Sequence, residues 1–205
     1  MQQNKSVTEN ERGKLIDWLS KIHQKFKMFP ETMFSMISLI DQYLRKKNVS
    51  INDLQLVGIS ALFISAKFEE TYQVPPLKQL VTCCAYKYSA SQILEKESEI
   101  IQELNFNLIV NSSYRFFEPY SKALGLELKN QHLAHYLLEL SLLQPKFLNY
   151  SPSLMAASVI YLIKKIRKSE TPWNPNMTLI VGYEEKELKS CAKELCGLLE
   201  SAPEL

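Results

Sequence analysis

Glycine is scarce in this chain: it has only five, and they form no cluster that resembles a phosphate-binding loop or a dinucleotide-binding fingerprint. Such sites need clustered glycines because the backbone must turn tightly and approach the phosphates closely. The sequence therefore gives little support for a nucleotide-binding enzyme.

A strong excess of one charge is also missing. The chain has 24 Lys and Arg against 22 Asp and Glu, a formal net charge of +2. A protein whose main work is to hold nucleic acid is usually much more basic on at least one face. The balance therefore disfavours nucleic acid as the partner and favours protein surfaces of neutral character.

The four cysteines lack the spacing of a zinc site. Cys83 and Cys84 are adjacent, and Cys191 and Cys196 are five residues apart, whereas a zinc knuckle places two residues between its cysteines. We therefore expect no metal and no cofactor, and interpret the cysteines as small buried residues in a reducing compartment.

Long apolar runs are absent as well. The first ten residues, MQQNKSVTEN, contain no apolar stretch, and no uninterrupted run approaches the ~20 residues of a membrane span. We expect a soluble intracellular protein with no membrane partner.

What the sequence has in abundance is helical periodicity. In the first half, apolar residues recur at steps of three and four, which is typical of amphipathic helices. Pro75-Pro76 precedes a short helix and Ser89 or Ser91 is placed to cap the next one. The predicted helices cover residues 15–26, 33–44, 54–68, 77–81 and 93–104.

The segment 54–68 differs from the others because it is apolar on almost every face. Ser50 before it has the character of an N-cap, with Asp53 at the third helical position. Exposing such a helix would cost about 25 cal/mol for each Å² of apolar surface, so other helices must surround it. We predict that it is the central helix of a five-helix unit.

The second half repeats this order. LVGISALFISAKFE, which starts at Leu56, aligns with LMAASVIYLIKKIR, which starts at Leu154. In this alignment Ser60 matches Ser158, and Tyr88 before the last helix of the first unit is matched by Tyr183. Agreement at two places in the same order favours an internal duplication.

The predicted fold is therefore all-α, with tandem five-helix repeats whose central helices are Leu54–Phe68 and Ser153–Ile166. We place an N-terminal arm at 1–9, the first repeat at 10–111 and the second at 112–205.

One charged pair stands out in the first repeat. Glu97 falls within the apolar stripe of the predicted helix 93–104, where a carboxylate needs a partner. Lys67, near the end of the central helix, is the candidate, and the alternative is that both side chains reach solvent. In the second repeat Lys165 aligns opposite Ala192. This asymmetry indicates that the first repeat has a task that the second lacks.

Four segments of the first half resemble the consecutive helices of the cyclin box, in order and spacing: RGKLIDWLSKIHQKF, ETMFSMISLIDQYL, LQLVGISALFISAKFEE and ILEKESEIIQELNFNL. The second half resembles the C-terminal repeat of A- and B-type cyclins through LLELSLLQPKFLNYSPSLMAASVIYLIKKI, Pro172-Trp173-Asn174 and Gly182-Tyr183, and its Lys-Phe-Leu-Asn-Tyr run leans toward the B type. The resemblance extends from about Asn10 to Leu199.

This resemblance implies a G2/mitotic regulatory subunit, itself not an enzyme, that binds and activates a cyclin-dependent protein kinase catalytic subunit in the nucleus and cytoplasm. It implies that Lys67 and Glu97 are the paired residues that hold the kinase-binding surface. The other matching positions are Phe68, Glu69, Glu70, Ile101, Phe106 and Leu108. For the apolar members, ordinary core packing is an open alternative, because an interface aromatic and a core aromatic look the same in sequence.

A groove for substrate docking peptides is implied too, with Leu15, Trp18 and Gln55 at its positions. Docking relatives carry a Met-Arg-Ala-Ile-Leu-like start to the first helix, and this chain has ERGKL over residues 11–15. Glu11 and Lys14 replace apolar residues. We therefore expect docking of a leucine-bearing peptide to be weak.

Two other classes remain to be weighed. Tandem cyclin-type repeats also occur in transcription factors that bind DNA, and the basic runs at 45–47 and 164–168 are the support for that alternative. Cations at helix C-termini explain those runs equally well. An enzyme has less support, because His23, His132 and His135 have no nucleophile or metal partner at a motif spacing.

Overall fold

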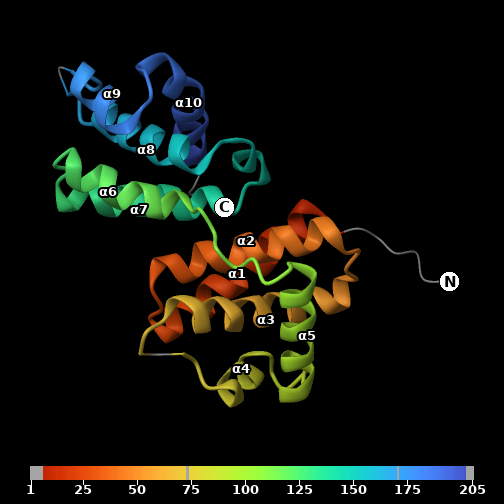
Figure 1. Ribbon diagram of the computed structural model, residues 1–205. Coiled ribbons are helices and arrows are strands. Elements are labelled where there is room, and N and C mark those ends of the chain that lie inside the picture. The colour runs from red at the N-terminus through yellow and green to blue at the C-terminus, as the bar shows by residue number, and fades with distance from the viewer. Residues whose placement is uncertain (1–6, 73, 170, 202–205) are drawn as a thin grey trace. The chain divides into compact units, whose positions relative to one another are not determined.

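The computed structural model describes residues 7–72, 74–169 and 171–201. Contacts divide the chain into two compact units, of which unit 1 ends at Val110 and unit 2 begins at Asn111. In Figure 1 unit 1 runs from red to yellow-green and unit 2 from green to blue. Residues 1–6 of the predicted N-terminal arm lie outside the described residues.

Within the described residues each unit has five α-helices and no strand. Those of unit 1 are α1 (Glu9–Phe26), α2 (Pro30–Lys46), α3 (Ile51–Glu69), α4 (Leu77–Cys83) and α5 (Ala90–Glu103). Those of unit 2 are α6 (Ser113–Ala123), α7 (Leu128–Leu142), α8 (Pro152–Ile166), α9 (Pro175–Val181) and α10 (Glu185–Ser201), with a short 3-10 helix, η1 (Pro145–Asn149), before α8. The predicted all-α fold of two five-helix repeats is confirmed.

The central helix of unit 1 is α3, as its all-round apolar sequence predicts. It packs against α1, α2 and α5, and every residue from Leu56 to Ala66 is buried. By length and composition α3 is the one described helix that is able to cross a membrane, but 67% of its apolar window is buried inside the protein. A Cβ on Gly58 would lie 2.8 Å from Cδ1 of Leu15, so this glycine lets α1 approach closely.

Unit 2 repeats this plan around α8, which packs against α6, α7 and α10. Each central helix is contacted at its start by a tyrosine hydroxyl, through a backbone carbonyl in unit 1 and a serine side chain in unit 2. The Tyr88 hydroxyl donates to the Asn52 carbonyl at 2.8 Å, and the Tyr183 hydroxyl lies 2.8 Å from Oγ of Ser153. The matched tyrosines of the sequence thus join the start of the last helix to the start of the central helix in each repeat.

Helices α1 and α2 are joined by a buried ion pair. Nε of Arg12 lies 2.6 Å from Oδ1 of Asp41, and Nη2 lies 2.7 Å from Oδ2. Both side chains are only 8% exposed, and two parallel charge-assisted hydrogen bonds fix their geometry. By contrast, Asp17 pairs with Lys21 on the surface of α1, where the two side chains are 62% and 71% exposed.

We expect Asp41→Asn to lower the free energy of unfolding of unit 1 by about 3–5 kcal/mol, because the buried Arg12 guanidinium loses the charge of the carboxylate that accepts its two hydrogen bonds. Asp17→Asn makes the same chemical change at an exposed pair and should cost less than about 1 kcal/mol. Urea unfolding followed by circular dichroism measures both. Equal losses in the two variants would show that the buried pair adds nothing specific to the fold.

Candidate functional site

The Lys67–Glu97 pair lies where α3 ends beside the middle of α5. The two side chains form an ion pair, with Lys67 43% exposed and Glu97 9% exposed. Nζ of Lys67 also lies 4.2 Å from the ring centroid of Phe63. Glu97 is thus a buried carboxylate, and the lysine that pairs with it is partly exposed to solvent. The predicted ion pair is present.

Helix α5 holds Glu97 in place through its own start and its apolar stripe. Ser89 and Gln92 form a capping box at the N-terminus, each side chain accepting from the backbone N–H of the other. Ile93 and Ile100, on the same stripe as Glu97, are fully buried. The position of the Glu97 carboxylate is therefore fixed by the buried residues one turn before it and one turn after it.

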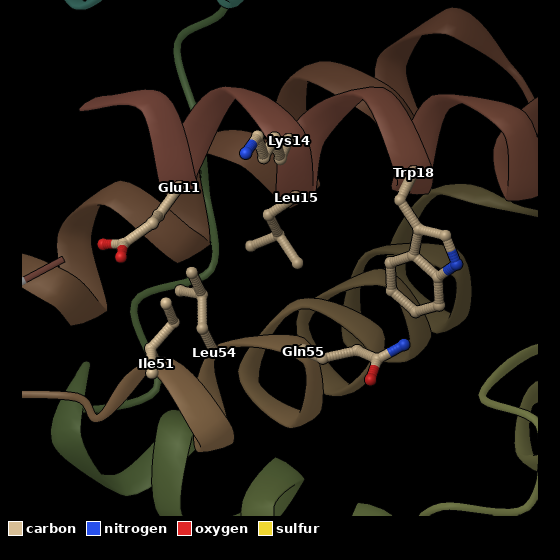
Figure 2. A pocket seen from close by; sticks show the side chains of 7 residues that line it. All are labelled: Glu11, Lys14, Leu15, Trp18, Ile51, Leu54 and Gln55. Atoms are coloured by element: carbon tan, nitrogen blue, oxygen red, sulfur yellow. The ribbon is translucent and has the colours of Figure 1, made fainter. Parts of the chain in front are cut away.

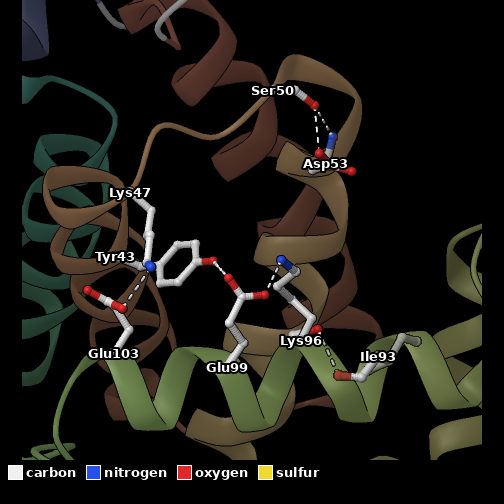
Figure 3. Close-up of polar contacts among 9 residues, drawn as sticks. Tyr43, Lys47, Ser50, Asp53, Ile93, Lys96, Glu99 and Glu103 are labelled. Carbon is white, nitrogen blue, oxygen red and sulfur yellow. Dashed lines mark hydrogen bonds and ion pairs between the residues drawn. The ribbon is translucent and has the colours of Figure 1, made fainter. Parts of the chain in front are cut away.

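A second polar network fixes α5 against α2 (Figure 3). The Tyr43 hydroxyl donates to Oε1 of Glu99 at 2.6 Å, and Nζ of Lys96 donates to Oε2 of the same carboxylate at 2.5 Å. Burial, and then the bond to Glu99, raise the pKa of Tyr43. The hydrogen bonds from Lys96 and Tyr43 lower the pKa of Glu99. At the end of α5, Lys47 pairs with Glu103 at 3.1 Å.

The two predicted aromatic side chains, Phe68 and Phe106, face solvent. Phe68 is 48% exposed and Phe106 is 75% exposed, so core packing does not account for either one. Phe106 also has a left-handed backbone, with φ of 59°. That conformation costs a non-glycine residue about 1–2 kcal/mol. The exposed Phe106 ring is therefore available for contact with a partner.

Tyr86 has the same local geometry and was not predicted as a site residue. It follows α4 as Phe106 follows α5, with φ of 60° and 74% of its surface exposed. No motif in the sequence signals this conformation. Tyr86 is therefore a suitable control residue for substitutions of Phe106.

Three of the remaining predicted positions are partly exposed near the same helix ends. Ile101, Leu108 and Glu69 are each intermediate in burial. Glu69 accepts a hydrogen bond from the Ser35 hydroxyl, so its carboxylate is already attached to α2.

Glu70 is placed differently from the others. It is 9% exposed, and its Oε1 accepts from the Phe29 N–H at 2.7 Å and from the Thr32 hydroxyl at 2.6 Å. Phe29 is the N-cap residue of α2 and makes no side-chain cap of its own, so Glu70 caps α2 from the end of α3. A carboxylate near a helix N-terminus is favourable. Because these hydrogen bonds use the carboxylate within the chain, Glu70 contributes to the packing of α2 against α3.

A groove of about 240 Å³ lies between the first turns of α1 and the start of α3 (Figure 2). The predicted residues Leu15, Trp18 and Gln55 all line it, and so do the two charged replacements. The full lining is Glu11, Lys14, Leu15, Trp18, Ile51, Leu54 and Gln55. Leu15 and Leu54 are buried, at 6% and 4% exposed, and form its apolar floor.

The predicted lack of a metal site concerns the cysteines and histidines of the described residues. No group of three or more His, Cys, Asp or Glu side chains there is placed to hold a metal ion. Burial raises the pKa of the Cys84 and Cys191 thiols to about 11. His135 packs against Tyr114 and Phe117 at ring centroid distances of 5.0 and 5.1 Å, and burial lowers its pKa. These are the environments of packing residues.

Comparison with known proteins gives one family for both units. The family model of the cyclin N-terminal domain matches residues 1–109, and that of the cyclin C-terminal domain matches residues 112–205. The chain is 36% identical over 200 residues to the G2/mitotic-specific cyclin cdc13 of Schizosaccharomyces pombe, covering 98% of this chain and 41% of that protein. It is 35% identical to cyclin-B2-1 of Arabidopsis thaliana, covering 98% of this chain and 47% of that one. The chain thus spans less than half the length of these relatives.

Solved structures share the fold. A viral cyclin from herpesvirus saimiri matches with a TM-score of 0.81 and 18% identity, covering 97% of this chain and 88% of that chain. A chain in the CAK complex from Chaetomium thermophilum bound to ATP-γ-S matches with a TM-score of 0.62 and 15% identity, covering 92% of this chain and 62% of that chain. At these identities the likeness concerns the fold alone.

The unequal exposure of Lys67 and Glu97 predicts unequal effects of removing them. Lys67→Ala leaves Glu97 buried without a counter-charge and should lower the free energy of unfolding by about 2 kcal/mol. Glu97→Ala leaves a lysine that reaches water and should cost about half as much. Urea unfolding of the two variants and of the double variant measures this, and the double variant should recover part of the Lys67→Ala loss. The reverse order would contradict the geometry.

Proposed function

The chain belongs to the cyclin family, and from this we propose that it binds a cyclin-dependent protein kinase catalytic subunit and activates it in G2 and mitosis. The observation that supports this best is the Lys67–Glu97 pair, together with the exposure of Phe68, next to Lys67 in sequence, and of Phe106, in the turn after α5. Its relatives in S. pombe and Dictyostelium discoideum are named as G2/mitotic-specific cyclins. The neighbour in the CAK complex comes from an assembly with ATP-γ-S.

In this proposal the chain contributes binding energy and the kinase contributes the chemistry. Phosphoryl transfer by a protein kinase needs a lysine–glutamate pair completed by its C-helix and an ordered activation loop. If the free kinase adopts that arrangement about 1% of the time, a partner must favour it by about 10⁴-fold, or about 5.5 kcal/mol, to reach about 99%. Burial of one phenylalanine side chain contributes about 1.5–3 kcal/mol. Two exposed phenylalanines with part-exposed Ile101 and Leu108 supply an apolar surface of that order.

The rest of the proposal follows from this role. The chain is a regulatory subunit and not itself an enzyme, and it acts where the kinase acts, in the nucleus and cytoplasm. Its second unit provides the same helical scaffold without the charged pair, since Ala192 stands opposite Lys165. The groove of unit 1 is the proposed place for substrate peptides.

The nucleic-acid alternative is not favoured, because residues of both basic runs are engaged within the chain. Lys46 donates to the Glu103 carbonyl at 2.7 Å, and Lys47 pairs with the Glu103 carboxylate. In unit 2, Nε of Arg167 donates to Oδ1 of Asn130 at 3.0 Å. Residues that tie helix ends together do not form a row of free cations for phosphates.

Phe106→Ala should weaken binding to the kinase catalytic subunit by about tenfold to a hundredfold, as loss of a central aromatic anchor does. Tyr86→Ala is the matched control, because Tyr86 shares the left-handed φ and the exposure of Phe106. It should leave binding within about twofold, like other residues outside an interface. The assay is titration of the kinase with the chain, followed by phosphorylation of a short peptide.

Both variants keep the same strained backbone, so their melting temperatures should agree within a few degrees and a folding defect is detected separately. Equal activation by the two variants would contradict the proposed surface. Loss of activation in Tyr86→Ala alone would place the surface at the α4 end of unit 1 instead.

A further inference from the structure

Units 1 and 2 fasten the end of the central helix in corresponding ways. In unit 1, Glu69 of α3 accepts a hydrogen bond from the Ser35 hydroxyl of α2. In unit 2 the aligned residue, Arg167, donates through Nε to Oδ1 of Asn130 on α7 at 3.0 Å. Each residue thus joins the end of the central helix to the second helix of its unit. The construction is repeated, but an acid in unit 1 has become a base in unit 2.

The residues next to this fastening are also matched. Lys67 and Phe68 of unit 1 align with Lys165 and Ile166 of unit 2. Phe68 is 48% exposed and Ile166 is 43% exposed. The position that holds Glu97 in unit 1 is occupied by a buried alanine in unit 2. Unit 2 therefore presents a lysine and an exposed apolar side chain without the carboxylate that pairs with Lys67.

The last helix adds two more lysines on this side of unit 2. Leu94 and Ser98 of α5 correspond to Lys189 and Lys193 of α10, and both lysines are exposed. They lie beyond the first turn of α10 and before its last turn, so compensation of a helix dipole at a C-terminus does not account for them. The α8–α10 patch is defined here by Ile166 and the three lysines 165, 189 and 193.

One carboxylate serves two of these lysines. Glu185 accepts from the Tyr161 hydroxyl at 2.8 Å and pairs with Lys189 at 3.5 Å. The Tyr161 hydrogen bond, and then the charges of Lys189 and Lys165, lower the pKa of this carboxyl. Among the described residues Lys193 forms no ion pair. Three lysines against one acid leave the patch positive.

We propose that the α8–α10 patch binds a short acidic segment of a partner protein, with an apolar side chain on Ile166 and aspartate or glutamate beside Lys165 and Lys193. Charge complementarity of this kind favours one partner and repels partners of the same charge. Nucleic acid is less suitable, because a surface that follows a phosphate backbone needs a longer row of free cations. The proposal does not depend on the proposed function, since unit 1 takes no part in it.

Three dye-labelled peptides of equal length test the charge preference. Each has one leucine in an alanine background and four identical flanking residues, which are aspartate, asparagine or lysine. Fluorescence anisotropy with the whole chain at low salt should give the aspartate peptide about fivefold tighter binding than the asparagine peptide, as two exposed ion pairs would. The lysine peptide should bind most weakly. The differences should shrink in 1 M salt, where the Debye length falls to about 3 Å.

Paired substitutions locate the binding. Lys165→Glu/Lys193→Glu should remove the preference for the aspartate peptide. Lys122→Glu/Lys129→Glu makes the same charge change at exposed residues of α6 and α7 and should leave the preference unchanged. Lys165→Gln/Lys193→Gln adds no acid, so it should lose the preference while its melting temperature stays within a few degrees. Ile166→Ala should weaken the aspartate and asparagine peptides by the same factor, about threefold.

Equal binding of the aspartate and asparagine peptides to the unaltered chain overturns the proposal. A preference that survives in Lys165→Gln/Lys193→Gln, or one that Lys122→Glu/Lys129→Glu also abolishes, overturns it as well, because the acidic segment would then bind elsewhere or by overall charge. Tighter binding of single-stranded DNA of the same length than of the aspartate peptide would identify a nucleic-acid surface instead.

Discussion

The burial of α3 on all sides determines where unit 1 has a surface to offer. Every residue from Leu56 to Ala66 is buried, which requires helices around it, and Gly58 lets one of them lie against its backbone. The burial of α3 by the other helices ends after Ala66. Ala66 is 0% exposed, whereas Phe68, two residues later, is 48% exposed. Lys67, between them, turns back to Glu97. The proposed kinase-binding surface thus includes the last turn of α3, where the other helices no longer cover the central helix.

The two repeats show how one scaffold carries a site only once. Both start their central helix at a serine cap and hold it with a tyrosine from the segment before the last helix, Tyr88 in unit 1 and Tyr183 in unit 2. These shared contacts serve the fold. The carboxylate that would meet Lys165 is replaced by the buried Ala192, and Lys165 instead lies 5.7 Å from the Tyr161 ring. Function belongs to the residues placed on a fold and not to the fold itself.

Apolar periodicity predicted the five helices of unit 1 and its central helix, and the internal repeat extended this plan to unit 2. The position of Glu97 within an apolar stripe indicated Lys67 as its partner. The central helices begin a little earlier than the predicted bounds, at Ile51 and Pro152, because their serine caps precede the first apolar residue. Beyond the Lys67–Glu97 pair, the contacts between distant segments had no signal in the sequence. The cap that Glu70 supplies to α2 joins residues 41 apart, and the Tyr43–Glu99 bond joins residues 56 apart. Neither the left-handed backbone of Phe106 nor its exposure has a signal in sequence, because the residue lies in the turn after α5, where apolar spacing no longer indicates which side chains are buried.

Hydrogen–deuterium exchange of the chain, alone and mixed with a cyclin-dependent kinase catalytic subunit, tests the central claim most directly. The account predicts that binding slows exchange in the last turn of α3 and from the end of α5 through Leu108, while the matching ends of α8 and α10 change little. The groove between α1 and α3 should also stay unchanged when no docking peptide is present. Slowed exchange confined to unit 2, or to the groove with none at the end of α3, would contradict the account.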